Sequence, residues 1–109
     1  MELNATLQAP LLTSAWVLLE VANALPGSRS RSRFERLLVG LRNAPNVEIV
    51  PADTTLFERG CQLYIERSDK EWSLTDCISF LVMKDRNITE ALTADHHFEQ
   101  AGFQSLLNT

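Results

Sequence analysis

The hydrophobic and polar positions along the chain predict strands that alternate with helices. Short apolar runs bounded by proline or polar clusters are typical of buried strands, whereas apolar residues every three or four positions indicate helices. The predicted elements are, in order, a strand at 10–14, a helix from 15 to about 25, a helix from 33 to about 43, a strand at 47–50, a helix at 54–67, a helix at 74–86, a strand at 88–94, a helical turn at 96–102 and a strand at 104–107. This alternation predicts an α/β fold with a mostly parallel sheet and helices on both faces.

Polar residues that cap helices mark three of the predicted helix starts. Ser14 and Asp53 each precede an apolar helical pattern, and Ser73 with Asp76 has the S-x-x-D form of a capping box. Pro26 and Gly27 end the first helix, and the segment 27–32 that follows is either a loop or a fraying helix start. The inner face of the helix at 54–67 is expected to carry Leu56, Gly60, Leu63 and Tyr64.

Composition fits one globular domain over residues 1–109. Apolar residues make up 45% of the 109 residues and charged residues 22%, which excludes a disordered chain. The apolar runs are far shorter than the roughly 20 residues that span a bilayer, and no export signal is recognisable at the start. Cys61 and Cys77 are therefore expected to be reduced thiols in a cytoplasmic protein, and Trp16, Trp72 and Phe80 are expected in the core.

Three acidic residues lie beside or inside apolar segments. Glu20 is within the run AWVLLEVANAL, Asp76 opens the run DCISFLVM, and Asp95 ends the strand-like ALTAD. A carboxylate buried without a partner costs several kcal/mol or becomes neutral. Three such acids suggest one shared partner, and a divalent metal ion is the simplest choice.

The predicted topology gives these acids a common location. Ligands of doubly wound sheets bind beyond the carboxyl ends of the strands. Asp95 follows a predicted strand, Glu20 lies in the helix after another, and Asp76 opens the helix before a third. We expect all three in one cleft, where carboxylates would bind Mg²⁺ or Mn²⁺ and support hydrolysis of a phosphodiester.

Each acid also has a purely structural explanation. Asp76 is either a metal ligand or only the second half of the capping box, and Asp95 is either a ligand or only the cap of the helical turn after it. Neither a cap nor an exposed face explains Glu20, for which an ion pair with an arginine is the remaining alternative.

The basic residues are unevenly distributed in a chain whose net charge is −4, which gives no overall attraction to nucleic acid. Arg29, Arg31, Arg33 and Arg36 fall in one short segment that is either a solvated loop or a phosphate-binding surface. His96 and His97 are expected at the surface because adjacent residues rarely face one metal; the alternative is that one lies near the cleft as a general acid or substrate contact.

Two segments resemble a known family. The runs T-D-C-x-S-F at 75–80 and L-T-A-D-x-x-F-x-x-A-G-F at 92–103 are similar to those of the PIN domain, specifically the VapC-like ribonuclease toxins. The resemblance implies a three-layer α/β/α fold and a Mg²⁺- or Mn²⁺-dependent endoribonuclease with Glu20, Asp76 and Asp95 as metal ligands. It also implies RNA as substrate, a homodimer and an inhibitory antitoxin protein as partner.

The chain also departs from the family pattern at its start. PIN domains begin with a strand that carries an acid in a D-T/S context, whereas MELNATLQ resembles the end of a helix. We expect a strand–helix unit of roughly 30 residues and the first acid to be missing, and the exposed strand edges to promote dimerisation. The alternative function is a catalytically silent PIN-like module for assembly. A phosphate-handling domain of the response-regulator type has less support, because we find no Gly-rich phosphate loop and no early acidic pair.

Overall fold

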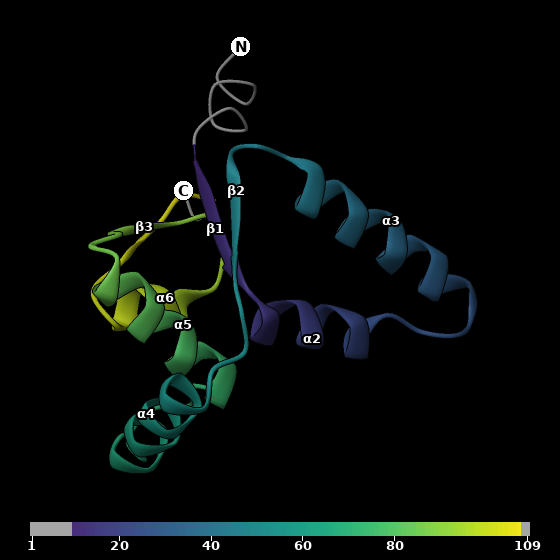
Figure 1. The fold of residues 1–109 in the computed structure, drawn as a ribbon. Helices are drawn as coiled ribbons and strands as arrows, with labels where there is room; N and C mark the ends of the chain where they lie inside the picture. Colours follow the sequence, from purple (N-terminus) through teal and green to yellow (C-terminus); the bar gives the residue numbers. More distant parts are fainter. Residues whose placement is uncertain (1–9, 108–109) are drawn as a thin grey trace. The chain divides into compact units, whose positions relative to one another are not determined.

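The structure, a computed structural model, describes residues 10–107 and consists of two compact units. The first unit ends at Ala52 and the second begins at Asp53, and each is described by itself. The first unit contains β1 (Leu11–Ser14), α2 (Ala15–Ala24), α3 (Arg29–Asn43) and β2 (Val47–Val50) (Figure 1). The second contains α4 (Thr54–Glu66), α5 (Leu74–Asp85), β3 (Glu90–Ala91), α6 (His96–Gln100) and β4 (Gln104–Ser105). The predicted helical end at residues 1–8 lies outside the described residues.

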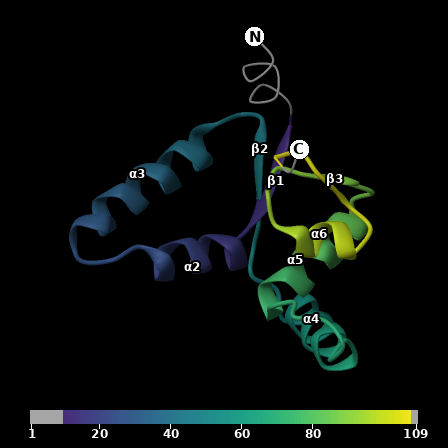
Figure 2. The same cartoon turned by 180° about the vertical axis from the view of Figure 1, so that it is seen from behind.

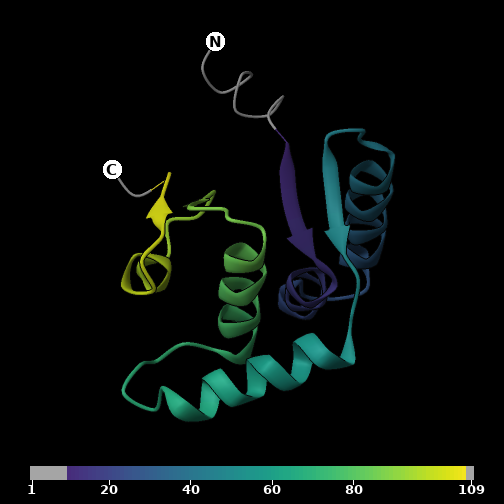
Figure 3. The same ribbon diagram turned by 60° about the vertical axis from the view of Figure 1, so that its left-hand side comes forward.

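The first unit is built on a parallel pair of strands. β1 and β2 run side by side in the same direction, with Leu11 opposite Val47 and Ser14 opposite Val50 (Figure 3). The predicted cap of α2 is confirmed, since the Ser14 hydroxyl accepts a hydrogen bond of 3.3 Å from the Val17 amide. The chain therefore passes from strand to helix without a loop.

The arginine segment belongs to a helix, so of its two predicted interpretations the helix start is confirmed and the loop is wrong. α3 begins at Arg29, four residues before the start that the apolar spacing predicts. The buried Ser30 hydroxyl donates a 2.6 Å hydrogen bond to the Pro26 carbonyl, which anchors the first turn. Local hydrogen bonding therefore extends the helix into a polar segment that has no apolar periodicity of its own.

The second unit begins with two helices that pack on each other, α4 and α5. The Asp53 carboxylate accepts a 3.1 Å hydrogen bond from the Leu56 amide and so confirms the predicted cap of α4. Leu56 and Gly60 are buried, but Tyr64 is 49% exposed, and its placement on the inner face is wrong. The buried face of α4 is therefore smaller than its apolar pattern predicts.

An ion pair joins the far end of α5 to α4. The Arg59 guanidinium donates hydrogen bonds of 2.6 and 3.0 Å to the two oxygens of Asp85. This pairing holds the pKa of the Asp85 carboxyl below its ordinary value, with the hydrogen bond as the main cause. Both side chains are more than 40% exposed, so the pair adds at most about 1 kcal/mol to stability.

Aromatic packing forms the core of the second unit. Phe80 of α5 is 1% exposed and meets Trp72 and Phe98 edge-on, each with ring centroids 4.9 Å away. Phe103 lies against the same ring at 5.7 Å. The predicted core positions of Trp72 and Phe80 are thus confirmed, and α6 is held beside α5 through Phe98 (Figure 2).

The last two predicted strands are real but short. β3 and β4 pair in parallel over two residues each, through bonds such as the 2.9 Å hydrogen bond from the Leu106 amide to the Ala91 carbonyl. The chain turns after Ala91, where the Thr93 amide bonds back to the Ala91 carbonyl, and this turn ends β3 before the predicted boundary. The fold is thus an α/β fold with parallel strands, as predicted, and its described residues contain two separate parallel pairs.

Both cysteines are free, as predicted. Cys77 is fully buried, and burial raises the pKa of its thiol, with the nearby charge of Asp76 adding to the effect. Within residues 10–107, no helix is both long and apolar enough to cross a membrane.

Candidate functional site

Asp76 is fixed at the start of α5 by a complete capping box. Its carboxylate Oδ2 accepts a 3.0 Å hydrogen bond from the Ser73 amide, and its own amide donates a 3.0 Å bond to the Ser73 hydroxyl. The side chain is only 18% exposed. The structural explanation for Asp76 is therefore correct, but it leaves the other carboxylate oxygen available for a second role.

Asp95 is the N-cap residue of α6. Its Oδ1 accepts a 2.9 Å hydrogen bond from the His97 amide, and its own amide donates a 3.1 Å bond to the Thr93 hydroxyl. The Ser105 hydroxyl donates to the Asp95 carbonyl and ties this residue to β4. Asp95 is thus held by bonds on both sides, with its side chain 39% exposed.

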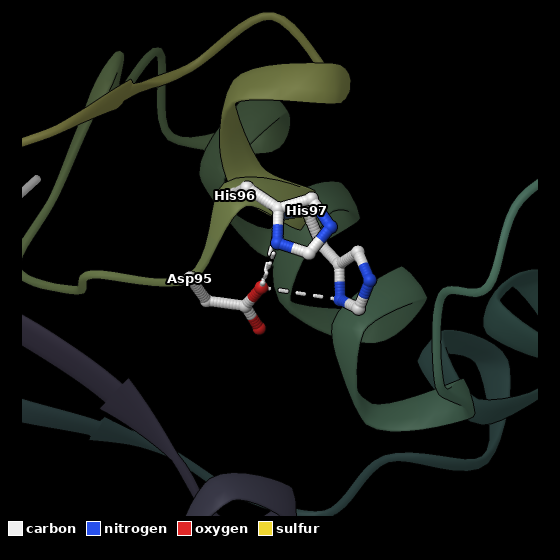
Figure 4. Close-up of side chains that lie close together, drawn as sticks. All are labelled: Asp95, His96 and His97. Carbon is white, nitrogen blue, oxygen red and sulfur yellow. Dashed lines mark hydrogen bonds and ion pairs between the residues drawn. The ribbon is translucent and has the colours of Figure 1, made fainter.

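His97 brings these two acids together. Its Nδ1 lies 3.4 Å from Asp76 Oδ2 and 3.2 Å from Asp95 Oδ1. Figure 4 shows the ring of His97 beside that of His96, with both turned toward the Asp95 carboxylate. The predicted meeting of Asp76 and Asp95 is therefore present within one unit.

The expectation of two surface histidines holds for one of them. The His96 side chain is 68% exposed, whereas that of His97 is 20% exposed and its Nδ1 is buried. The sequence feature that could have predicted the position of His97 is the cap at Asp95. This cap places His97 in the first turn of a short helix, beside the capping carboxylate. The neighbouring Phe98 then anchors this turn to the core.

Glu20 differs from the other two acids in position and surroundings. It lies on α2 in the first unit, while Asp76 and Asp95 belong to the second. Its side chain is exposed, so the predicted burial of Glu20 is wrong. Leu19 beside it is also 55% exposed, which shows that this stretch of α2 is less enclosed than its apolar sequence suggests.

The arginines form an exposed basic helix face. Arg29, Arg33 and Arg36 occupy positions spaced by four and three residues on α3, so they share one side of the helix. Arg31 is exposed as well, on another side. These guanidinium groups are available to phosphate oxygens. They belong to the first unit, whereas Asp76 and Asp95 belong to the second.

The donor atoms at Asp76 and Asp95 fit a divalent cation. Among the described residues, hydrogen bonds engage one oxygen of each carboxylate, Asp76 Oδ2 and Asp95 Oδ1. The second oxygen of each remains for a hard cation such as Mg²⁺ or Mn²⁺. Asp95, His96 and His97 also offer donor atoms that all lie within 4.8 Å of one another.

The sequence of the chain matches a known family. The model of the PIN domain family matches residues 2–104, and the chain therefore belongs to the PIN domain family.

Among solved structures, the chain is similar to the VapC20 toxin of Mycobacterium tuberculosis, described as a toxin that cleaves the sarcin–ricin loop. The two share 26% sequence identity with a TM-score of 0.79, and the match covers 96% of this chain and 80% of that one. The predicted resemblance to VapC-like PIN domains is thus confirmed. A search of the curated proteins found no match.

Proposed function

We propose that the protein is a divalent-metal-dependent endoribonuclease of the VapC type that hydrolyses phosphodiester bonds of RNA. The observation that carries this proposal is the meeting of Asp76 and Asp95 around His97 in a PIN-family chain. Membership of this family supports an enzyme that acts on RNA, and the two carboxylates supply the oxygen donors that its chemistry needs.

Asp76, Asp95 and Glu20 are the proposed ligands of Mg²⁺ or Mn²⁺. Held by these carboxylates, such an ion would supply activation of a water molecule and stabilisation of the charge on the departing oxygen. The capping bonds of Asp76 and Asp95 fix both carboxylates before the ion arrives, which lowers the entropic cost of binding it. Glu20 of α2 is proposed as the third ligand on the basis of the resemblance to VapC-like PIN domains.

Arg29, Arg31 and Arg33 are the proposed RNA contacts. Their exposed guanidinium groups bind phosphate oxygens through paired hydrogen bonds and carry no base preference of their own. VapC20 is described as a toxin that cleaves the sarcin–ricin loop. We propose structured RNA as the substrate class to test first. The other partners proposed for a cytoplasmic toxin of this type are a second copy of the chain and an antitoxin protein.

The proposal is tested by cleavage of a structured RNA hairpin with Mg²⁺ or Mn²⁺. EDTA is expected to abolish cleavage. Asp76→Asn and Asp95→Asn should each lower the cleavage rate by at least about 100-fold, because removal of a metal ligand reduces activity more than removal of a residue that only supports a ligand. Circular dichroism checks that both variants stay folded.

The matched control is Asp69→Asn, also in the second unit. Asp69 is exposed and paired with Arg67, which lowers the pKa of its carboxyl to about 2, so this variant also removes a negative charge. Its cleavage rate should equal that of the unmodified chain. Cleavage that survives both EDTA and Asp76→Asn would refute the proposal.

The second candidate function is a catalytically silent PIN-like assembly module. The exposure of Glu20 favours this alternative, because it removes the argument from burial that this acid needs a metal ion as its partner. A silent module would show neither RNA cleavage nor binding of Mn²⁺ by calorimetry, despite a stable fold.

A further inference from the structure

We propose that Asp95, His96 and His97, with Asp76 as a fourth donor, bind a borderline transition-metal ion of the Zn²⁺, Co²⁺ or Ni²⁺ class in preference to Mg²⁺. The inference concerns metal binding by the free protein and does not require nuclease activity. It goes beyond the carboxylate site proposed above because it assigns the two imidazoles as ligands.

The distances between the donor atoms suit such an ion. His97 Nδ1 lies 3.2 Å from Asp95 Oδ1 and 3.4 Å from Asp76 Oδ2, and His96 Nδ1 lies 3.8 Å from Asp95 Oδ1. Tetrahedral ligands about 2.0–2.1 Å from a metal are separated by about 3.3 Å. The donor atoms of Asp95, His96 and His97 all lie within 4.8 Å of one another. The His96 side chain is 68% exposed, so it is free to move toward the other donors.

The state of His97 points independently to a ligand. Its Nδ1 is buried yet makes no hydrogen bond within the described residues, although two carboxylate oxygens lie close to it. A buried polar atom left without a hydrogen bond destabilises the folded state. Coordination of a cation through this nitrogen would remove that cost while also neutralising the two acids.

The donor set selects the class of ion. Imidazole nitrogen suits zinc, copper, iron and nickel, whereas Mg²⁺ prefers oxygen ligands and keeps its waters. Since Asp76 and Asp95 serve both sites, an ion held by the two histidines would exclude Mg²⁺ from the same carboxylates. Micromolar Zn²⁺ is therefore expected to inhibit any Mg²⁺-dependent cleavage by this chain.

The test is a titration of the untagged full chain with Co²⁺, followed by its visible absorption bands. One Co²⁺ per chain is expected to bind in the presence of millimolar Mg²⁺. The chain has only two histidines, so His96→Ala and His97→Ala remove all imidazole ligands between them. Each substitution should weaken Co²⁺ binding by at least tenfold.

The control variant is Cys61→Ser, because thiolate is the other ligand that competes for Co²⁺. It should bind Co²⁺ as the unmodified chain does, without the intense near-ultraviolet band of thiolate coordination in either protein. His96 is exposed, so His96→Ala stays informative even if His97→Ala fails to fold. Absence of binding, or binding that neither histidine substitution weakens, would overturn the inference.

The outcomes also separate this inference from the proposed nuclease. Co²⁺ binding that depends on both histidines, without RNA cleavage in Mg²⁺ or Mn²⁺, would refute the nuclease and support the mixed site. Cleavage in Mg²⁺ with no histidine-dependent Co²⁺ binding would support the nuclease and refute the mixed site.

Discussion

Cys77 illustrates how a single residue beside the site is shaped by its surroundings. It follows Asp76 on α5, is fully buried and belongs to the aromatic core of the second unit. Removal from water disfavours the charged thiolate, and the neighbouring carboxylate disfavours it further. The raised pKa keeps Cys77 neutral at physiological pH, so it is a poor nucleophile.

We therefore expect Cys77 to resist alkylation in the folded protein. Iodoacetamide at pH 8 should modify Cys61, which is only partly buried, at least about tenfold faster than Cys77, because reaction at Cys77 requires a thiolate and an opening of the core. Mass spectrometry of the two peptides measures the rates. Equal labelling in guanidinium chloride is the control, and equal labelling of the folded chain would contradict the prediction.

Individual residues of the site were only partly predictable from the sequence. Asp76 and Asp95 could be identified because a cap and an apolar neighbour are local features. The exposure of Glu20 could not, because an apolar run does not tell which side of its helix another element covers. The position of His97 follows from a cap and from core packing together, and only the first is visible in the sequence.

At the scale of elements, the close packing of α4 on α5 depends on Gly60. A Cβ atom built at this glycine would overlap the side chain of Ile78, which is 1% exposed and has little room to move. The helices can approach each other at this point because Gly60 has no side chain. The position of Asp76 on α5 is thus supported from the opposite helix.

Gly60→Ala is expected to destabilise the protein. Overpacking of a core costs about 1–3 kcal/mol, while alanine regains up to about 1 kcal/mol of helix propensity, so the net loss should be up to about 2 kcal/mol. Urea denaturation followed by circular dichroism measures it.

Gly40→Ala is the matched control, since Gly40 lies inside α3 and a Cβ there meets nothing within 4 Å. This substitution should raise the free energy of unfolding by up to about 1 kcal/mol. Stabilisation by both substitutions would show that Ile78 does not restrict Gly60.

Elements were more predictable than their pairing. Four helices begin or end at residues that a cap or a proline marks, and β1 and β2 match their predicted ranges closely. The strands at 88–94 and 104–107 were overestimated because their length is set by a turn and by the partner strand, which are not local properties.

At the scale of the whole molecule, the parallel strand pairs leave edges available. Within the described residues of the first unit, β1 pairs with β2 alone, and a two-stranded ladder is marginal without further partners. Unpaired edges promote association with another chain. The sequence predicted the parallel α/β class from the alternation of elements, but which strands pair depends on contacts far apart in the chain.

We predict that the protein is a dimer in solution. Light scattering after size-exclusion chromatography at micromolar concentration should give about twice the chain mass of 12.3 kDa. A mass of one chain at that concentration would contradict the prediction, and a reference protein of similar size calibrates the measurement.

The capping role of Asp95 has an evolutionary consequence. Asparagine caps helices as well as aspartate does, so Asp95→Asn should preserve the start of α6 while it removes the charge of the proposed ligand. One base change converts an aspartate codon into an asparagine codon. A lineage of this fold is therefore one mutation away from a folded protein without the carboxylate that we propose for metal binding, and such a copy would pass every selection for stability.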